Sequence, residues 1–283
     1  MIKRLILTAL FLSLGLSQAL SNELSNPEFT STTASAELAT DPGFDTGTGW
    51  STQAPWSISG STATHNGTAA GNLSTNDEPV PAYQSCMVTV EILEYNQSSN
   101  CEVRDTFFPS KQAINEFPST DILYDCNTGS SPTDFALRAK GTDLTTIVLG
   151  GISLKTLTLD NWTEVGTRTA TEHTCYDPNQ GLVKFDSGGT VFSIKQALAN
   201  EDYNMMLNVD TLTSGTVVVS DGGANSYEIT SAGMSGFPLT IATGELYIST
   251  KGGAAASFII DSVSAVVKSG DLSDINGLLL HVY

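Results

Sequence analysis

The side chains that could catalyse a reaction are plentiful in this chain, but their spacing matches no common catalytic pattern. Asp and Glu total 30, and the 3 histidines stand apart at His65, His173 and His281. The sequence contains no G-x-S-x-G nucleophile turn, no H-E-x-x-H metal helix and no glycine loop that leads into a phosphate-binding helix. The carboxylates fall mainly in turns, such as Asp77 and Glu78, where water solvates them. We therefore predict a protein that is not an enzyme, with a secreted hydrolase that uses two carboxylates as a lower-ranked hypothesis.

Cysteine and histidine spacing predicts no zinc site and leaves the redox state of the thiols open. Cys86, Cys101, Cys126 and Cys175 include no C-x-x-C pair, and the histidines are scattered. Either Cys101 and Cys126 lie on neighbouring strands and pair in an oxidising compartment, or the cysteines are buried reduced thiols. No disulfide pairing follows from the sequence.

Charge excludes one large class of function. The 283 residues include 12 Lys and Arg against 30 Asp and Glu, which gives a formal net charge of −18 and an isoelectric point near 4.2. Such a chain cannot replace the counterions around a phosphate backbone, so we expect no nucleic-acid partner. An apolar fraction of 40% is typical of a folded protein, and the many Gly, Ser, Thr, Asn and Asp residues disfavour helices.

Short alternating segments separated by turn residues predict an all-β protein made of antiparallel sandwiches. In the first half, alternation is clear at residues 56–59, 87–93 and 146–149, and in the second half it recurs at 205–209, 216–219, 239–241 and 245–248. Turn clusters such as 221–225 (DGGAN) separate these segments. One internal segment, 193–200, could form a helix, with the edge of a strand as the alternative.

The two halves of the chain resemble each other. Residues 88–95 correspond to 205–212, and residues 145–154 correspond to 256–266, so a long core strand and a closing strand occur twice. We predict two tandem jelly-roll domains at 41–158 and 159–269. They follow an apolar segment (1–20) and a linker or extended arm (21–40). A tail (270–283) ends in an apolar run that packs on a domain or on a partner.

The amino terminus has two interpretations. A basic start (1–4), an apolar run (5–16) and small residues at positions 17 and 19 are typical of a secretory signal peptide cleaved after residue 19. Alternatively, the segment is a retained apolar helix that docks the protein onto a larger assembly through Leu5, Leu7, Leu10, Phe11 and Leu14. In both interpretations the run is too short for a transmembrane span.

The opening and closing segments carry a resemblance to a known family. Residues 43–50 (GFDTGTGW), followed by 56–65 (WSISGSTATH), resemble the opening of carbohydrate-binding-module-like jelly rolls, in which an F-D-x-G-x-G-W start is found. Residues 258–264 (FIIDSVS) are similar to the last strand of such domains, where F-x-I-D-x-V-S is common. The resemblance covers most of residues 41–268 and implies a β-sandwich in each half.

The resemblance implies exposed aromatic rings that stack on sugars, with amides and carboxylates that bind sugar hydroxyls. We expect Tyr95, Tyr124 and Tyr227 to be the exposed glycan-binding rings. Trp50 and Trp56 belong to the opening motif, and we expect both rings to fill the core between the sheets.

The resemblance also implies a calcium ion that ties the closing strand to the opening one. Asp261 is the position that matches the family's carboxylate. Calcium needs six or more oxygen ligands, and no second ligand can be named from the sequence. The alternative, which we prefer, is that Asp261 caps a turn or accepts backbone N–H groups.

Jelly rolls of this kind occur in secreted glycoside hydrolases and very often in bacteriophage tail and other virion proteins. We therefore predict a non-enzymatic structural protein of a bacteriophage virion, either a capsid decoration or a tail appendage, docked by its amino-terminal segment. Its expected partners are other virion proteins or further copies of itself, and cell-surface glycans bound at the virion surface. The alternative is a secreted bacterial carbohydrate-binding or adhesive protein with a cleaved signal peptide.

Overall fold

The computed structural model describes residues 22–66, 69–77, 79–82, 84–95, 102–105, 119–126, 132, 134–140, 146–169 and 171–268. Side chains are described at all of these positions except 102–105, 119–126 and 140. The apolar segment 1–20, with the expected docking residues Leu5, Leu7, Leu10, Phe11 and Leu14, lies outside the described residues, as does the tail 270–283. The docking or signal-peptide role of the first segment and the packing of the tail stay predictions.

All regular elements in the described part of the chain are β-strands, which confirms the all-β prediction. Their bounds are β1 Thr32–Ala34, β2 Trp50–Thr52, β3 Trp56–Ile58, β4 Ala63–His65, β5 Gly71–Thr75, β6 Ser85–Tyr95, β7 Glu102–Asp105, β8 Ser119–Cys126, β9 Ala136–Lys140, β10 Ile147–Leu159, β11 Thr163–Val165, β12 His173–Asp177, β13 Leu182–Ser187, β14 Ser193–Ala197, β15 Asp202–Ser214, β16 Val217–Ser220, β17 Ser226–Ile229, β18 Gly233–Thr240, β19 Glu245–Thr250 and β20 Ala256–Val267.

The chain divides into two compact units. The first unit consists of Phe29–Asp160 and Thr167–Asp186, and the second unit consists, among the described residues, of 22–28, Asn161–Gly166 and 187–268. The grouping places 22–28 with the second unit and 167–186 with the first. The predicted domain boundaries, 41–158 and 159–269, stay predictions.

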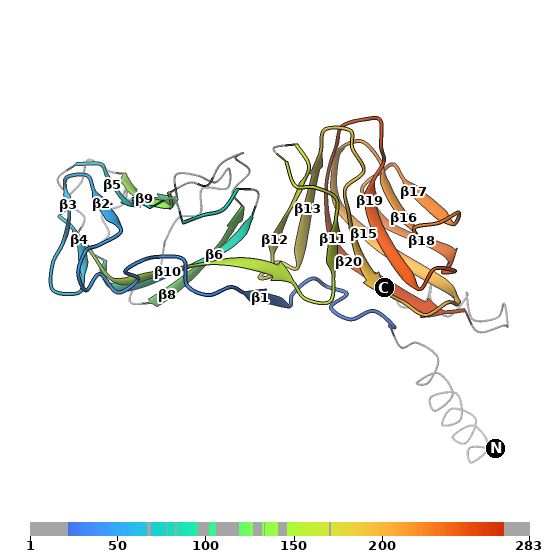
Figure 1. The fold of residues 1–283 in the computed structure, drawn as a ribbon, viewed down its shortest axis with the longest axis horizontal. Helices are drawn as coiled ribbons and strands as arrows, with labels where there is room; N and C mark the ends of the chain where they lie inside the picture. The colour runs from blue at the N-terminus through green and yellow to red at the C-terminus, as the bar shows by residue number, and fades with distance from the viewer. Residues whose placement is uncertain are drawn as a thin grey trace, which may run out of the picture. The chain divides into compact units, whose positions relative to one another are not determined.

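The first unit contains two antiparallel sheets around an apolar core (Figure 1). One sheet has the order β3-β4-β10-β6-β8, with β1 also paired to β10, and the other has the order β2-β5-β9-β7. Alternate residues of the long strands β6 and β10 point into this core, as the fully buried Val90 and Ile152 illustrate. Trp50 and Trp56 are buried in the same core, as expected from the sequence.

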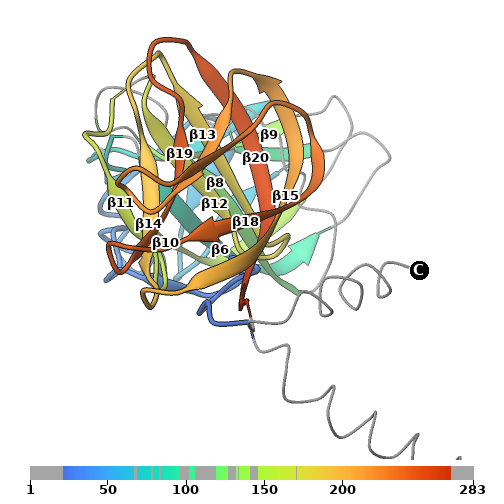
Figure 2. The same ribbon diagram turned by 90° about the vertical axis from the view of Figure 1, so that its right-hand side faces the viewer.

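The second unit contains an antiparallel sheet with the order β11-β14-β19-β16-β17. In the same unit, the long strand β15 pairs antiparallel with both β18 and β20 (Figure 2). Residues 193–197 form the strand β14 rather than a helix, because Ile194 and Gln196 alternate toward the buried side of the sheet. The remaining strand predictions for this half of the chain are confirmed.

The predicted internal repeat has a structural counterpart in each unit. In the first unit β6 pairs with β10, with Val88 opposite Leu154, and in the second unit β15 pairs with β20, with Leu207 opposite Val263. Both ladders are antiparallel and both contain register shifts of the kind that a β-bulge produces. The two long strands that correspond in sequence therefore also correspond in position.

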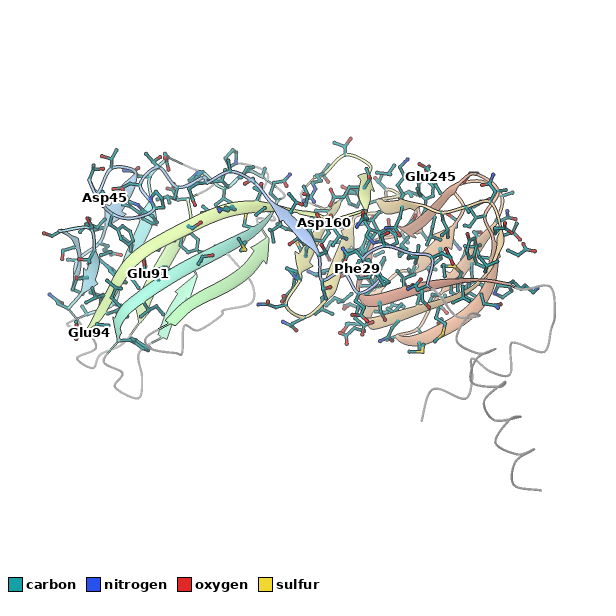
Figure 3. All side chains as sticks on the ribbon, turned by 90° about the horizontal axis from the view of Figure 1, so that it is seen from below. Phe29, Asp45, Glu91, Glu94, Asp160 and Glu245 are labelled. Carbon is teal, nitrogen blue, oxygen red and sulfur yellow. The ribbon has the colours of Figure 1, made fainter. Side chains whose placement is uncertain are left out.

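The segment before the first sandwich is an arm held by hydrogen bonds. Strand β1 pairs with the end of β10, close to Asp160 (Figure 3). The carboxylate of Asp160 accepts hydrogen bonds from the hydroxyls of Ser31, at 2.5 Å, and Thr33, at 2.6 Å. The bond from Ser31 and then the bond from Thr33 hold the pKa of Asp160 below its ordinary value, although burial opposes them. The hydrogen bonds from the arm to Asp160 are therefore strongest when its carboxylate is ionised.

Candidate functional site

A surface pocket of about 370 Å³ lies at one end of the strands of the second unit. It is formed where β15 begins, where β18 and β20 end, and where the turn between β16 and β17 enters β17. The residues that line it are Asp202, Tyr203, Ala224, Asn225, Ser226, Pro238, Leu239, Thr240 and Lys268. The lining therefore combines charged, amide and hydroxyl groups with a few apolar surfaces, which is the composition of many small-ligand sites.

Backbone pairing brings the charged lining residues together. Asp202 is opposite Thr240 in the ladder of β15 with β18, and the N–H of Lys268 donates to the carbonyl oxygen of Asp202 at 2.7 Å. Tyr203 follows on β15, is 1% exposed and donates its hydroxyl to the carbonyl oxygen of Ala199 at 3.2 Å. Burial, followed by the negative charges of two glutamates, raises the pKa of Tyr203, so the phenol stays neutral at physiological pH.

Asp221 holds the turn that carries the opposite wall of the pocket. Its side chain is 1% exposed, and its carboxylate accepts hydrogen bonds from the N–H of Gly223 at 2.8 Å, the N–H of Asn225 at 3.2 Å and the Asn225 Nδ2 at 2.9 Å. A longer bond from the N–H of Ala242, at 3.4 Å, ties this turn to the connection between β18 and β19. Burial raises the pKa of Asp221, but these hydrogen bonds lower it by more, so the net pKa is below its ordinary value.

The pocket offers acceptors and donors that a polyhydroxylated ligand could use. Asp202 accepts the Thr240 hydroxyl at 2.5 Å through Oδ1, which leaves Oδ2 for a ligand. Asn225 is anchored through its amide nitrogen, so its carbonyl oxygen can accept a further hydrogen bond. Asp202 is the only carboxylate among the lining residues, whereas glycoside hydrolysis commonly needs two.

Tyr227 is an exposed aromatic residue that adjoins the pocket lining along the chain. It is 40% exposed, and its ring stacks on that of Phe237 with centroids 4.1 Å apart and planes inclined by 1°. Along their strands, Tyr227 follows the lining residue Ser226, and Phe237 precedes the lining residue Pro238. The exposure of Tyr227 agrees with the sequence-based expectation, and its role as a glycan-binding residue stays a prediction.

The structure places Tyr95 differently from the expectation of an exposed ring. Tyr95 is 7% exposed and belongs to the apolar core of the first unit. Ile92 is opposite Leu149 and Glu94 is opposite Val148, so the extra residue Leu93 forms a bulge that reverses the alternation of β6. Strict alternation would turn Tyr95 outward, and the bulge turns it inward. Tyr124 lies in β8, and its side chain is outside the described residues.

Asp261 accepts hydrogen bonds from two side chains, and its role as a calcium ligand stays a prediction. Its carboxylate accepts hydrogen bonds from the Asn208 Nδ2 at 2.7 Å and from the Ser262 hydroxyl at 3.0 Å. Both donors are side chains, whereas the preferred alternative expected backbone N–H groups. In the part of the chain that the structure describes, no group of three or more His, Cys, Asp and Glu side chains could hold a metal ion.

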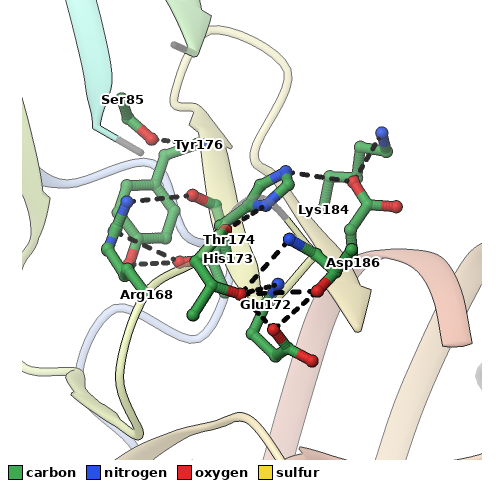
Figure 4. Close-up of polar contacts among 10 residues, drawn as sticks. Ser85, Arg168, Glu172, His173, Thr174, Tyr176, Lys184 and Asp186 are labelled. Carbon is green, nitrogen blue, oxygen red and sulfur yellow. Dashed lines mark hydrogen bonds and ion pairs between the residues drawn. The ribbon is translucent and has the colours of Figure 1, made fainter. Parts of the chain in front are cut away.

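A second polar cluster lies on the hairpin of β12 and β13 in the first unit (Figure 4). Nε2 of the buried His173 lies 3.4 Å from Oδ2 of Asp186, which the Lys184 ammonium also contacts at 2.7 Å. This Nε2 makes no hydrogen bond with the described residues. The N–H of Tyr176 donates to the hydroxyl of Ser85 at 3.1 Å and so ties the hairpin to the start of β6. We assign the cluster to the stability of this hairpin.

Two further properties bear on where the protein acts. Cys86 is a buried thiol, whereas Cys175 is disulfide-bonded, so of the two alternatives left open by the sequence, the one in which all four cysteines are reduced does not hold. Side chains at positions 101 and 126 lie outside the described residues. Within the described ranges, no helical segment has the length and apolar character needed to span a bilayer.

The pocket residues Asp202, Asn225, Thr240 and Lys268 do not figure in the sequence-based predictions. Each is a common polar residue near a turn or a strand end, and the sequence carries no local signal that they converge. The sequence does indicate the turn at 221–225, which carries Asn225, but its composition predicts only a connection between two strands and no binding role.

Comparisons with known proteins give structural similarities only. No family model matches the sequence, and no curated protein matches it. One similar solved structure is the N-terminal CBM22-1-CBM22-2 tandem domain from Paenibacillus barcinonensis Xyn10C, with a TM-score of 0.31 and 11% identity, covering 88% of this chain and 100% of that one. Another is a fucolectin from the serum of Morone saxatilis (striped bass), with a TM-score of 0.25 and 10% identity, covering 89% and 100%. A third is the tandem of CBM51 modules of the family 98 glycoside hydrolase Sp3GH98 from Streptococcus pneumoniae, with a TM-score of 0.25 and 8% identity, covering 84% and 99%. At these TM-scores the similarities carry no argument about the site.

Proposed function

We propose that the chain is a non-enzymatic glycan-binding protein whose sugar site is the pocket of the second unit. One observation carries the proposal: a polar pocket of about 370 Å³ is lined by Ser226 and Pro238, and their chain neighbours Tyr227 and Phe237 form a partly exposed aromatic stack. A sugar ring has hydroxyl groups that donate and accept hydrogen bonds and an apolar face of C–H groups. The polar lining of the pocket supplies partners for the hydroxyl groups, and the neighbouring aromatic stack supplies a surface for the apolar face.

The polar partners of the sugar would be Asp202, Asn225 and Thr240. An ionised carboxylate only accepts hydrogen bonds, an amide oxygen accepts, and a hydroxyl does both, so together they match the hydroxyl pattern of a pyranose. The exposed part of the Tyr227 ring would cover the apolar face of the sugar, and Phe237 behind it keeps the ring from turning away. The single carboxylate of the lining supports binding without hydrolysis.

We place this activity at the surface of a bacteriophage virion, with secretion from a bacterium as the alternative. The resemblance of the opening and closing motifs and the apolar amino-terminal segment support this setting. The disulfide-bonded Cys175 fits an oxidising destination in either case. The intact mass of the natural protein separates the two settings: a particle-bound chain that keeps residues 1–19 supports the virion, and a chain that begins at residue 20 supports secretion.

A glycan array probed with the purified full chain tests the binding function. We expect binding to at least one class of glycan, and Tyr227→Ala should lower the affinity about five- to tenfold, since an aromatic contact is worth on the order of 1 kcal/mol. Met234→Ala is the matched control, because Met234 is also exposed, at 57%, and lies at the opposite end of β18 from the lining residues Pro238 and Thr240. An array without any binding, or equal losses in the two variants, would overturn the proposal.

A further inference from the structure

Among the residues that the structure describes, Lys268 forms no ion pair, and the chain as a whole is poor in cations. The chain has 12 Lys and Arg against 30 Asp and Glu. Among lysines with described side chains, Lys184, Lys195 and Lys251 each contact a carboxylate at 2.6 to 2.7 Å, whereas Lys155 and Lys268 are in no ion pair. Of these five lysines, Lys268 is the one that lines the pocket.

Lys268 and Asp202 are neighbours through their main chains, but their charged side-chain groups do not contact each other. Their main chains are joined by a hydrogen bond of 2.7 Å from the N–H of Lys268 to the carbonyl oxygen of Asp202. Nevertheless their side chains form no ion pair, which would require the ammonium and a carboxylate oxygen to lie within 4.0 Å. The pocket therefore has an acceptor-only group and a donor-only group at separate positions of its lining.

We propose that the pocket selects a sugar that carries a carboxylate, such as a uronic or a sialic acid. The sugar carboxylate would bind the Lys268 ammonium, while Asp202 and Asn225 accept its hydroxyl groups. The inference rests on the proposed function of the same pocket. A neutral sugar could use Asp202 equally well, but it would leave the Lys268 ammonium with hydroxyl partners alone, and hydrogen bonds between two charged groups are the stronger ones.

The negative net charge of the protein excludes non-specific attraction as the cause of a preference for acidic sugars. A protein with a net charge of −18 repels acidic polymers at long range, so an acidic glycan gains nothing from non-specific attraction to the surface. Salt screens this repulsion beyond a Debye length of roughly 8 Å at physiological ionic strength. Preference for an acidic sugar over its neutral counterpart must then come from a local cation.

Matched pairs of oligosaccharides test the proposal by isothermal titration calorimetry on the full chain. The pairs are a glucuronic-acid oligosaccharide with its carboxyl-reduced form, and sialyllactose with its carboxyl-reduced form. We expect the acidic member of one pair to bind on the order of tenfold more tightly, the factor that a hydrogen bond to a charged group adds. The pair that gives this preference identifies the class of acidic sugar.

Lys268→Met removes the charge and keeps the length of the side chain. We expect this variant to lose the preference, because its loss of affinity for the acidic member should exceed its loss for the neutral member by on the order of tenfold. Lys251→Met is the control, because Lys251 is an exposed lysine of the same unit that contacts Glu228 instead, at 2.7 Å. Neutral sugars that bind as tightly as acidic ones, or a preference that survives in Lys268→Met, would overturn this inference and leave the proposed function intact. If no sugar of either kind binds, here or on the array, both fail.

Discussion

Asp221 is the residue whose replacement tests the construction of the pocket most directly. It does not line the pocket, yet its carboxylate accepts four hydrogen bonds that hold the turn between β16 and β17 and connect it to the segment before β19. Asp221→Ala removes all four bonds, and Asp221→Asn keeps one acceptor oxygen at nearly the same volume. The two variants therefore differ in how many bonds they lose.

The size of the effect follows from the geometry. Three of the bonds, at 2.8, 2.9 and 3.2 Å, are of ordinary length, and the fourth, at 3.4 Å, is long enough to be weak. At about 1 kcal/mol for each ordinary bond, we expect Asp221→Ala to lower the free energy of unfolding of the second unit by about 3 kcal/mol. Asp221→Asn should cost about half as much, because the amide still accepts from one side.

Hydrogen exchange followed by mass spectrometry localises the loss. Exchange should accelerate in peptides that cover residues 217–229 and 239–248, with no change in peptides from 147–159 of the first unit. Asp210→Asn is the control, because Asp210 is exposed, lies in the same unit and accepts only the Thr211 hydroxyl at 2.9 Å. Equal stability of Asp221→Ala and Asp210→Asn would refute the argument that the buried carboxylate organises the turn.

The pH dependence gives an independent check on the same residue. The folded pKa of Asp221 is lowered, so its contribution to stability is present above the unfolded pKa of about 3.9 and is lost as the pH falls through the folded value. We expect the stability gap between the natural chain and Asp221→Asn to be constant from pH 7 to about pH 5 and to close in more acidic solution. A gap that widens on acidification would contradict the sign.

The remaining predictions concern the arm and one turn. Asp160→Asn should speed amide exchange in residues 31–34 at pH 7, because the ionised carboxylate accepts hydrogen bonds from both hydroxyls of the arm. The pKa of Asp160 is lowered in the folded state, so exchange in the natural chain should become as fast as in the variant only when the pH falls below about 4. Unchanged exchange at pH 7 would mean that strand pairing alone holds the arm. Gly222→Ala should destabilise the second unit by about 1 to 3 kcal/mol in urea unfolding, since φ is +74° at this position and a Cβ would lie 2.5 Å from a ring carbon of Tyr247. Gly253→Ala is a suitable comparison, because φ is also positive there, at +88°, but no atom lies within 4 Å of the added Cβ.

Strand positions could be predicted because alternation is a local property of the chain. Residues that point alternately to a buried and a solvated face must alternate in polarity, and this pattern identifies β6, β10 and β15 without any knowledge of their partners. The segment 193–200 is too short for periodicity to separate a helix from a strand, and pairing with β19 makes it β14.

Exposure of single aromatic residues was harder to predict, because it depends on the phase of the alternation. One bulge residue, Leu93, reverses the direction of Tyr95 and places its ring in the core. Tyr227 lies on β17, at the edge of its sheet, where a ring can remain partly exposed while stacking on Phe237.

By itself the sequence determined the all-β class, the position of most strands and the repeat of a long strand with a closing strand, since each of these depends on neighbouring residues. Only the tertiary structure decided the composition of the pocket. Asp202, Asn225, Thr240 and Lys268 are far apart in the chain, and they meet because antiparallel registers align three strand ends and because a buried carboxylate fixes the facing turn. Register and burial are collective properties of the folded chain, which is why no local pattern in the sequence could reveal the site.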